Sequence, residues 1–116
     1  MPDKRTLNEV LTEYRQAAEG TDDLADAKTQ NQAAHRIHAC YKTLRETNEG
    51  REAIIALMSD ANPHVRTWAA AHSLQWKPEQ AKKVLEALRD ENTFPYSFDA
   101  EMTLEEYRKG RLSFDY

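Results

Sequence analysis

Apolar residues recur along the chain at the three- and four-residue spacing of an amphipathic helix. The first such stripe consists of Leu7, Val10, Leu11, Tyr14 and Ala18. The same pattern predicts five main helices and a short C-terminal one, over residues 7–19, 22–46, about 53–58, 63–75, 78–90 and 104–109. With 3 Gly and 4 Pro, the chain has few breaks for the turns of an all-β fold. We therefore expect an all-α fold.

Residues suited to helix ends lie between these stripes. Thr6 and Glu9 have the spacing of a capping box, in which each side chain satisfies a free backbone N–H. Asn62 is placed to cap a helix that begins with Pro63, where the missing N–H of proline costs nothing. Pro78 repeats this arrangement one helix later. These positions predict where three of the helices begin.

Turn residues give further predictions. Gly20 is expected to be left-handed after the first helix, with Thr21 capping the second. Residues 47–50, Thr-Asn-Glu-Gly, predict a turn. Thr103 starts another capping-box pattern before the last helix, and Gly110 is expected to close that helix.

Residues 57–74 contain the order of residues typical of one HEAT-type helical hairpin: Leu57, Asp60, Val65-Arg66, Ala69-Ala70 and Leu74. The small alanines would let two helices approach closely, and Val65, Trp68 and Leu74 would be buried between them. Asp60 and Arg66 are expected to pair or to bond the carbonyls of the turn.

The chain resembles a family of small bacterial HEAT-like domains of largely unknown function. The resemblance covers most of the chain and is carried by residues 60–70 (DANPHVRTWAA), 83–88 (KVLEAL) and 100–110 (AEMTLEEYRKG). Tyr107 stands where tryptophan is commoner in that family. The resemblance implies a short α-α superhelix. It also implies a relationship to proteins that look like immunity proteins encoded beside bacterial toxins, and it carries no catalytic residues.

Length and charge narrow the class of protein. The 116 residues suit a single domain over 1–116, and 16 Lys and Arg against 20 Asp and Glu give a net charge of -4. This balance argues against general affinity for nucleic acid, which depends on basic residues. No apolar run approaches the roughly 20 residues of a membrane span, no secretory signal precedes the first helix, and Cys40 is the only cysteine. We expect a cytoplasmic protein that binds neither membranes nor nucleic acid.

Residues 91–116 form a distinct acidic and aromatic C-terminal strap. Residues 90–106 contain six acids and no Lys or Arg. Phe94, Tyr96 and Phe98 alternate along the chain, which predicts an extended segment with one apolar side. Such a strap would cover the exposed end of a helical repeat array, with its acids simply solvated, or it would bind a basic partner.

The second possibility leads to the main functional hypothesis, an immunity protein that neutralises a toxin domain with a basic surface. The residues expected to bind it are Asp90, Glu91, Tyr96, Asp99, Glu101, Glu105 and Glu106. The alternative is an adaptor or scaffold that binds an endogenous protein through a concave face. That face would consist of Gln32, His35, Arg36, His64, Thr67 and Gln75.

Two other patterns bear on enzyme chemistry. His35 and His38 are three residues apart on one helix, but Cys40 falls nearly opposite His35, so the sequence predicts no metal site and no cofactor. Trp68 and His72, with Trp76 four residues further, could line the pocket of a base-excision enzyme. The basic stripe is too weak for duplex binding, so we expect Trp68 and His72 to be core residues and the protein not to be an enzyme.

Overall fold

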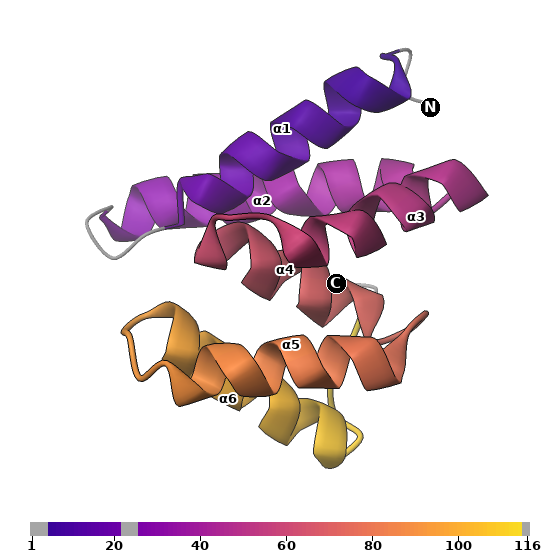
Figure 1. Ribbon diagram of the computed structural model, residues 1–116. Helices are drawn as coiled ribbons and strands as arrows, with labels where there is room; N and C mark the ends of the chain where they lie inside the picture. Colours follow the sequence, from indigo (N-terminus) through magenta and orange to yellow (C-terminus); the bar gives the residue numbers. More distant parts are fainter. Residues whose placement is uncertain (1–4, 22–25, 115–116) are drawn as a thin grey trace.

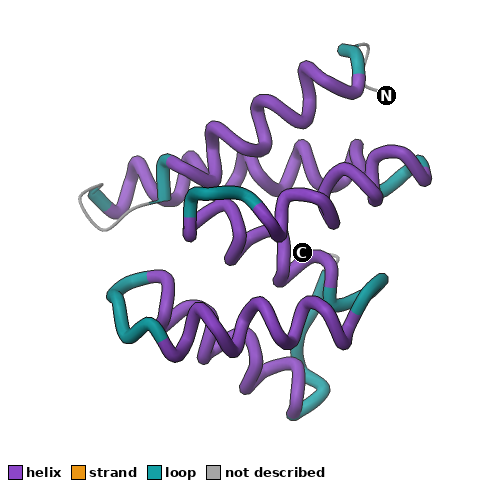
Figure 2. The backbone as a smooth tube through the Cα atoms, in the orientation of Figure 1, coloured by secondary structure: helices purple, strands orange, loops and turns teal. Residues whose placement is uncertain are grey.

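The computed structural model describes residues 5–21 and 26–114, and over these ranges the chain is helical with no strand (Figures 1 and 2). The helices are α1 (Leu7–Glu19), α2 (Ala27–Leu44), α3 (Asn48–Ala56), the 3₁₀ helix η1 (Leu57–Ser59), α4 (Pro63–Ser73), α5 (Pro78–Asp90) and α6 (Tyr96–Arg108). The predicted all-α fold is confirmed. Residues 22–25, the start predicted for the second helix, lie outside the described residues. No helix in the described part of the chain is long and apolar enough to cross a membrane.

The helix α4 lies at the centre of the molecule. It contacts α1, α3, α5 and α6, while α1 packs along α2 and α5 packs along α6. In Figure 1, α1 to α3 lie on one side of α4, and the α5–α6 pair lies on the other. The segment after α6 returns to the group formed by α1, α2 and α3. There Arg45, the C-cap residue of α2, donates a hydrogen bond to the carbonyl of Phe114 at 3.2 Å.

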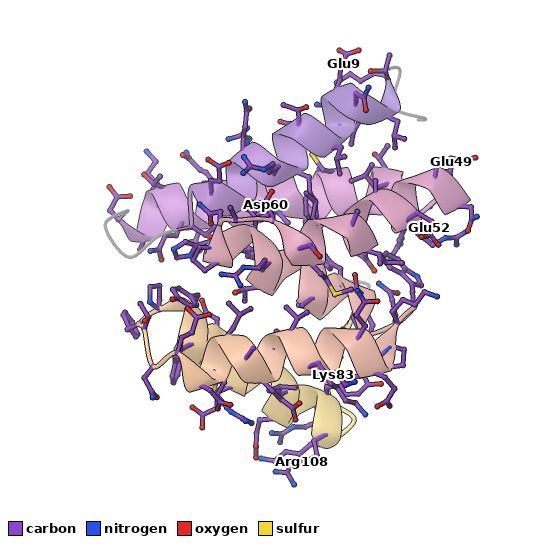
Figure 3. All side chains as sticks on the ribbon, in the orientation of Figure 1. Glu9, Glu49, Glu52, Asp60, Lys83 and Arg108 are labelled. Carbon is purple, nitrogen blue, oxygen red and sulfur yellow. The ribbon has the colours of Figure 1, made fainter. Side chains whose placement is uncertain are left out.

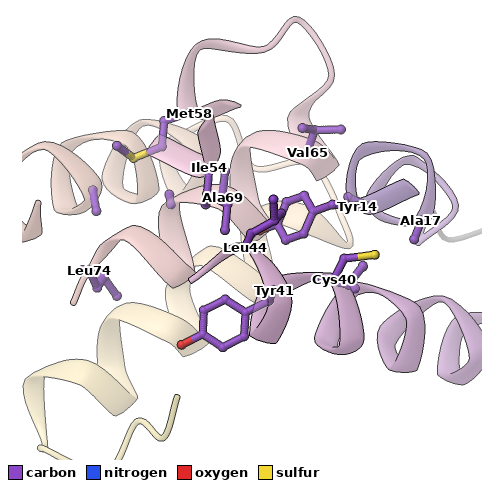
Figure 4. Close-up of a cluster of buried hydrophobic side chains, with 14 of the residues drawn as sticks. Tyr14, Ala17, Cys40, Tyr41, Leu44, Ile54, Met58, Val65, Ala69 and Leu74 are labelled. Carbon is purple, nitrogen blue, oxygen red and sulfur yellow. The ribbon is translucent and has the colours of Figure 1, made fainter. Parts of the chain in front are cut away.

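The central core explains the position of α4 (Figure 4). Val65, Ala69 and Ala70 of α4 and its C-cap residue Leu74 are all buried, as the hairpin pattern predicts. They pack in one cluster with large side chains of α1, α2 and α3. Trp68 is only partly buried, and its indole Nε1 donates to the Thr21 hydroxyl at 3.1 Å. The helices α3 and η1 both contact α4. The HEAT-like assignment of this pair stays a prediction.

Three of the six predicted helix starts are confirmed, at residues 7, 63 and 78, while the third helix begins at Asn48 and not at about residue 53. Thr6 and Glu9 form the capping box of α1, and the side chain of Asn62 accepts from the backbone N–H groups at the start of α4, where Pro63 is the first helical residue. The cap of α2 is Asp26 and not Thr21. The Thr21 hydroxyl instead donates to the carbonyl of Ala18 at the end of α1.

Both predictions at Gly20 and Gly50 were wrong. Gly20 has φ -75°, a right-handed conformation that any residue adopts. Gly50 lies inside the first turn of α3, because Thr47 caps that helix through a bond from the Gly50 N–H. It is buried, and a Cβ at this position would overlap the carbonyl group of Leu44 at the end of α2. Close packing of two helix ends, and not turn geometry, therefore requires a glycine at position 50.

The extended strap and the short helix 104–109 were also wrong, because a single helix, α6, covers Tyr96–Arg108. Its start is bonded to α5, since Ser97 Oγ donates to the Leu88 carbonyl at 2.5 Å and accepts from Thr93 N at 2.8 Å. Thr103 is internal, and its hydroxyl donates to the Asp99 carbonyl and caps nothing.

Gly110 closes α6 as predicted. It has φ 72°, and it and Arg111 donate back to the carbonyls of Tyr107 and Glu106. This pair of bonds is a Schellman motif, which needs a left-handed residue at the position of Gly110.

Asp60 joins α1 to the turn before α4, and its ion-pair partner is Arg15, where the sequence predicted that Asp60 and Arg66 would pair or bond the carbonyls of the turn. Its two oxygens accept from Arg15 Nε at 2.7 Å and Nη2 at 3.0 Å, and Oδ1 also accepts from Asn62 N at 2.9 Å. Figure 3 shows Asp60 in the turn beneath α1. The Arg15 guanidinium, followed by the Asn62 N–H, holds the pKa of Asp60 below its usual value, and the charge of Arg66 adds to this effect.

We expect Asp60→Ala to lower the free energy of unfolding by about 1–2 kcal/mol, because it removes a bidentate charged bond and a turn cap at a largely covered carboxylate. Urea unfolding at pH 7 measures this loss. The matched control is Asp90→Ala, whose ion pair with Arg89 is exposed (42% and 68%) and whose loss should change stability by less than about 0.5 kcal/mol. Equal effects of the two substitutions would contradict the role given to Asp60.

Candidate functional site

An exposed apolar stripe begins in the loop before α6 and continues along that helix. Phe94, Phe98 and Met102 are 70%, 52% and 45% exposed, and they are three of the four large apolar side chains exposed on the described residues. They are spaced by four residues, and the ring centroids of Phe94 and Phe98 are 6.4 Å apart. We call these three residues the α6 stripe. Scattered apolar residues are normal on a surface, but a contiguous group is typical of an interaction site.

The inner side of α6 fixes which face it exposes. Tyr96, Ser97 and Ala100 are buried, and Leu104 and Tyr107 pack against the central core. Because these five residues anchor one side of the helix against α5 and α4, the opposite side is left to solvent.

Tyr96 was predicted to bind a partner, but it is only 8% exposed. Its hydroxyl donates to Glu91 Oε1 at 2.6 Å, and its ring lies edge-on to His64. The alternation of aromatics suggested that Phe94, Tyr96 and Phe98 share a face, which holds only for an extended chain. In a helix Phe98 lies away from Tyr96, so Phe94 and Phe98 are the aromatic residues presented to a partner.

Carboxylates flank the α6 stripe. By helical periodicity, Asp99 and Glu106 lie on one side of Phe98 and Met102, and Glu101 and Glu105 lie on the other. Asp90 ends α5, and Glu91 follows it in the loop. Residues 90–114 contain six acids and three bases, a net charge of -3. All the acidic residues predicted for the site therefore belong to one region around α6.

Ion pairs reduce the negative charge in the C-terminal half of α6. Glu105 pairs with Lys109 and Arg108, which hold the pKa of Glu105 below its usual value, and Glu106 pairs with Arg111. Figure 3 shows Arg108 at the far end of the helix from the α5–α6 loop.

The N-terminal half of α6 keeps more of its negative charge. In residues 5–21 and 26–114, neither Asp99 nor Glu101 is within ion-pair distance of a base. Neighbouring groups that displace water raise the pKa of Asp99, with His64 acting in the opposite direction. Because Asp99 and Glu101 are not ion-paired in the described part of the chain, the negative charge on α6 is neutralised least beside Phe98.

Two hollows adjoin the stripe. One, of about 670 Å³, lies where α5 ends and α6 begins, and Phe94 and Phe98 line it. The other, of about 560 Å³, lies along the α5–α6 groove and is lined by Leu104 and Tyr107. Arg89 and Glu101 line both, so the two hollows are neighbours.

The residues of the alternative concave face are not brought together. Gln32, His35 and Arg36 are all exposed on α2, and Arg36 is directed toward α1, where its Nε donates to Glu13 Oε1 at 3.4 Å. This arrangement follows from the packing of α2 along α1.

The α4 residues of that set are also separate from one another. His64 contacts Tyr96 of α6, and Thr67 is buried with its hydroxyl bonded to the backbone of its own helix. Gln75 is exposed overall, yet its amide donates to the Tyr41 hydroxyl at 2.7 Å. These six residues therefore do not share one surface.

A buried histidine and tyrosine cluster was predicted only in part. His72 is a core residue, as expected, and its Nδ1 lies 2.7 Å from the Tyr14 hydroxyl. The Tyr41 ring stacks on it at 4.0 Å with an interplanar angle of 5°. Burial lowers the pKa of His72 to about 3, with smaller contributions from His38 and Arg45, so the ring is neutral at pH 7. A histidine within an apolar stripe predicts a buried polar partner. The sequence does not identify that partner, Tyr14, which lies on another helix.

Cys40 and the possible metal ligands are the remaining candidates for chemistry. Cys40 is buried, its thiol donates to Glu13 Oε2 at 3.4 Å, and burial raises its pKa to about 11, which disfavours the reactive thiolate. Among the residues that the structure describes, no three His, Cys, Asp or Glu side chains are placed to hold a metal ion.

These features define a small all-α domain with an exposed aromatic and acidic face. A comparison with family models matched residues 9–107 to a domain of unknown function, DUF2019. The chain belongs to the DUF2019 family. The matched range includes the whole α6 stripe. A search of curated proteins and a search of solved structures each found no match.

Proposed function

We propose that the protein is a bacterial immunity protein that neutralises a cognate toxin domain by covering the toxin's active or substrate-binding surface. The observation that supports this proposal best is the α6 stripe, which exposes Phe94, Phe98 and Met102 within an acidic surface. The resemblance to HEAT-like domains related to immunity proteins supplies the toxin as the partner. On this proposal the protein acts in the cytoplasm by binding and needs neither a catalytic residue nor a cofactor.

The stripe and its acids would contribute in different ways. Burial of a large apolar side chain at an interface supplies roughly 1.5–3 kcal/mol, and aromatic residues in the centre of an interface carry much of the binding energy. The surrounding carboxylates would attract a basic surface and increase the rate of association. An interface of this kind matches a toxin whose active surface is basic, such as one that acts on a polyanion.

The direct test is to express the protein together with the product of the adjacent gene. We expect growth to be rescued from that product and the two purified proteins to bind with nanomolar affinity. The association rate should fall at least about tenfold between low and physiological salt, since it depends on charge steering. An adjacent product that is not toxic, or that the protein does not bind, would remove the proposal.

A charge-reversal pair locates the binding face. Asp99→Lys with Glu101→Lys should weaken binding by about a hundredfold or more, because it places two like charges against a basic partner. The control is Glu49→Lys with Glu52→Lys, which makes the same change of charge on exposed residues of α3, on the side of the molecule away from α6 (Figure 3). An equal loss in both variants would show that only net charge matters. Retained affinity in the α6 variant would favour the adaptor hypothesis with a binding face on α2 or α4.

A further inference from the structure

The hollow at the start of α6 combines two chemical characters in one place. The rings of Phe94 and Phe98 form its apolar part, with their centroids 6.4 Å apart and their planes at 42°. The carboxylates of Asp90 and Glu101 line it from α5 and from α6. Flat aromatic faces next to carboxylates are complementary to a cation that is also planar and weakly hydrated.

A resident arginine lies at the edge of this hollow. Arg89 Nε is 3.0 Å from Asp90 Oδ1, and Arg89 is itself a lining residue. The bond that Arg89 donates to Asp90, with smaller contributions from the charges of Glu86 and Glu101, raises the pKa of Arg89. Both partners of the ion pair are substantially exposed, at 42% and 68%, so the pair is weak and open to competition. The chain thus already satisfies one of these carboxylates with a guanidinium.

We infer that the hollow between Phe94 and Phe98 receives an arginine side chain of the partner, whose guanidinium stacks on the rings and bonds Glu101 and Asp90. Arg89 is then the competitor that the incoming arginine displaces from Asp90. An arginine fits better than a lysine because its guanidinium is planar, stacks on aromatic rings and bonds a carboxylate through two N–H groups. An apolar side chain fits less well, since it would cover the carboxylates without pairing them. This inference rests on the proposed function for the origin of the arginine, but the hollow can be tested without the toxin.

The test uses N-acetylarginine N-methylamide as the probe and follows the amide signals of residues 89–102 by NMR. We expect saturable shifts at millimolar probe, and an affinity at least about fivefold higher than that of the uncharged citrulline analogue, because the charge is what the carboxylates recognise. The lysine analogue should be weaker than the arginine one. Equal binding of the arginine and citrulline analogues would overturn the inference.

Substitutions distinguish the competing residue, Arg89, from the residues that bind the incoming arginine. Arg89→Gln should raise the affinity for the arginine probe about threefold, because it frees Asp90, whereas Glu101→Gln and Phe98→Ala should each lower it by about threefold or more. Glu79→Gln, a highly exposed acid at the start of α5, is the control and should change nothing. A loss of affinity in Arg89→Gln would overturn the inference, since it would make Arg89 part of the receptor. Circular dichroism and urea unfolding of each variant confirm that the fold is kept.

The two proposals fail in distinguishable ways. If the probe binds as described but the adjacent gene product is not bound, the immunity function is wrong and the arginine site stands. If the toxin is bound and neutralised with full affinity by Phe98→Ala and Glu101→Gln, the proposed function stands and the arginine site is wrong.

Discussion

Gly50→Ala should lower the free energy of unfolding by about 3 kcal/mol or more, the largest loss expected for a single methyl group in this protein. The added Cβ would overlap the backbone carbonyl of Leu44, and a backbone group cannot turn away as a side chain does. Relief requires α3 to move away from the end of α2. That movement would disturb Ile54, which is fully buried four residues further along α3. Urea unfolding at pH 7 measures the loss.

The other two glycines provide matched controls for the same substitution. Gly20→Ala should change stability by less than about 0.5 kcal/mol, since Gly20 has a right-handed backbone and an added Cβ would be in ordinary contact, 3.4 Å from the Ala17 carbonyl. Gly110→Ala should cost about 1 kcal/mol, because its φ of 72° strains any residue with a Cβ although the surrounding space is open. The expected order of loss is therefore Gly50, Gly110, Gly20. A loss at Gly50 no larger than that at Gly20 would contradict the packing argument.

The three glycines also show where sequence patterns succeed and where they do not. Gly110 was predicted correctly because its role depends on neighbouring residues of the same helix end. Gly50 follows a Thr-Asn-Glu sequence that resembles a turn, and its real constraint is the carbonyl of another helix. No local pattern contains that information. The same distinction explains Asp60, whose partner Arg15 is 45 residues away.

The error at α6 has a different cause. Three alternating aromatics predicted an extended strap, but the positions that face the core, with 96 and 100 buried and 104 and 107 partly buried, follow a helical spacing that was also present in the sequence. The second pattern determines the structure because it matches the packing surface that α5 and α4 provide. Once the segment is a helix, the aromatics divide between an inner face and an outer face. The acidic residues of the candidate site could thus be predicted from composition, whereas the exposed Phe94 and Phe98 required the fold.

The concave-face alternative illustrates the limit of residue lists without a fold. Its six residues are polar positions on or next to α2 and α4, two helices that the sequence predicts to line one surface. Because α2 packs along α1, Arg36 bonds Glu13, and because α4 is central, Thr67 is buried. A polar residue on a helix is available to a partner only if no neighbouring helix covers its side, which periodicity alone does not reveal.

Replacing both members of the buried hydrogen bond, in the double variant Tyr14→Phe with His72→Phe, should remove a pH dependence of stability between pH 6.5 and 5. In the native protein the pKa of His72 is about 3, against an ordinary value of 6.5, so the unfolded chain binds one more proton than the folded one between these values. The stability that the neutral ring contributes is complete above pH 6.5 and is lost as the pH falls toward 3. The expected slope rises from about 0.7 kcal/mol per pH unit at pH 6.5, where the unfolded histidine is half protonated, to about 1.4 near pH 5, so the change between pH 6.5 and 5 is about 1.6 kcal/mol.

No acidic group in the described structure would stabilise a protonated His72 ring by hydrogen bonding to it. Tyr14 of α1 and Tyr41 of α2 contact the ring, His38 of α2 and Trp68 of α4 lie further out, and the charge of Arg45 opposes protonation. The Nε2 atom of His72 is buried without a hydrogen-bond partner, so a second N–H there would be unsatisfied. No carboxylate bonds the ring in the described structure.

The chosen pH window lies above the range in which the carboxylates with lowered pKa values titrate. The raised pKa of Asp99 gives a contribution of opposite sign that the native protein and the double variant share. The carboxylates with lowered pKa values, such as Asp60 and Glu105, lose their contribution only below about pH 4.5, since stability from a depressed acid is complete above its ordinary pKa. The pKa of His38 is also lowered by burial, so it adds a smaller slope of the same sign that both proteins share.

Urea unfolding at pH 6.5, 5.75 and 5 provides the measurement, with His35→Gln as the control for loss of an exposed histidine. The double variant should be flatter than the native protein, and the control should follow the native slope. The single variant His72→Phe should be less stable at pH 6.5 than the double variant by about 1 kcal/mol, because it removes the hydrogen bond between Tyr14 and His72 but keeps the polar hydroxyl beside an apolar ring. A double variant that keeps the full native slope would show that another group takes up the proton, and the neutral His72 would then have no part in the acid sensitivity of the fold.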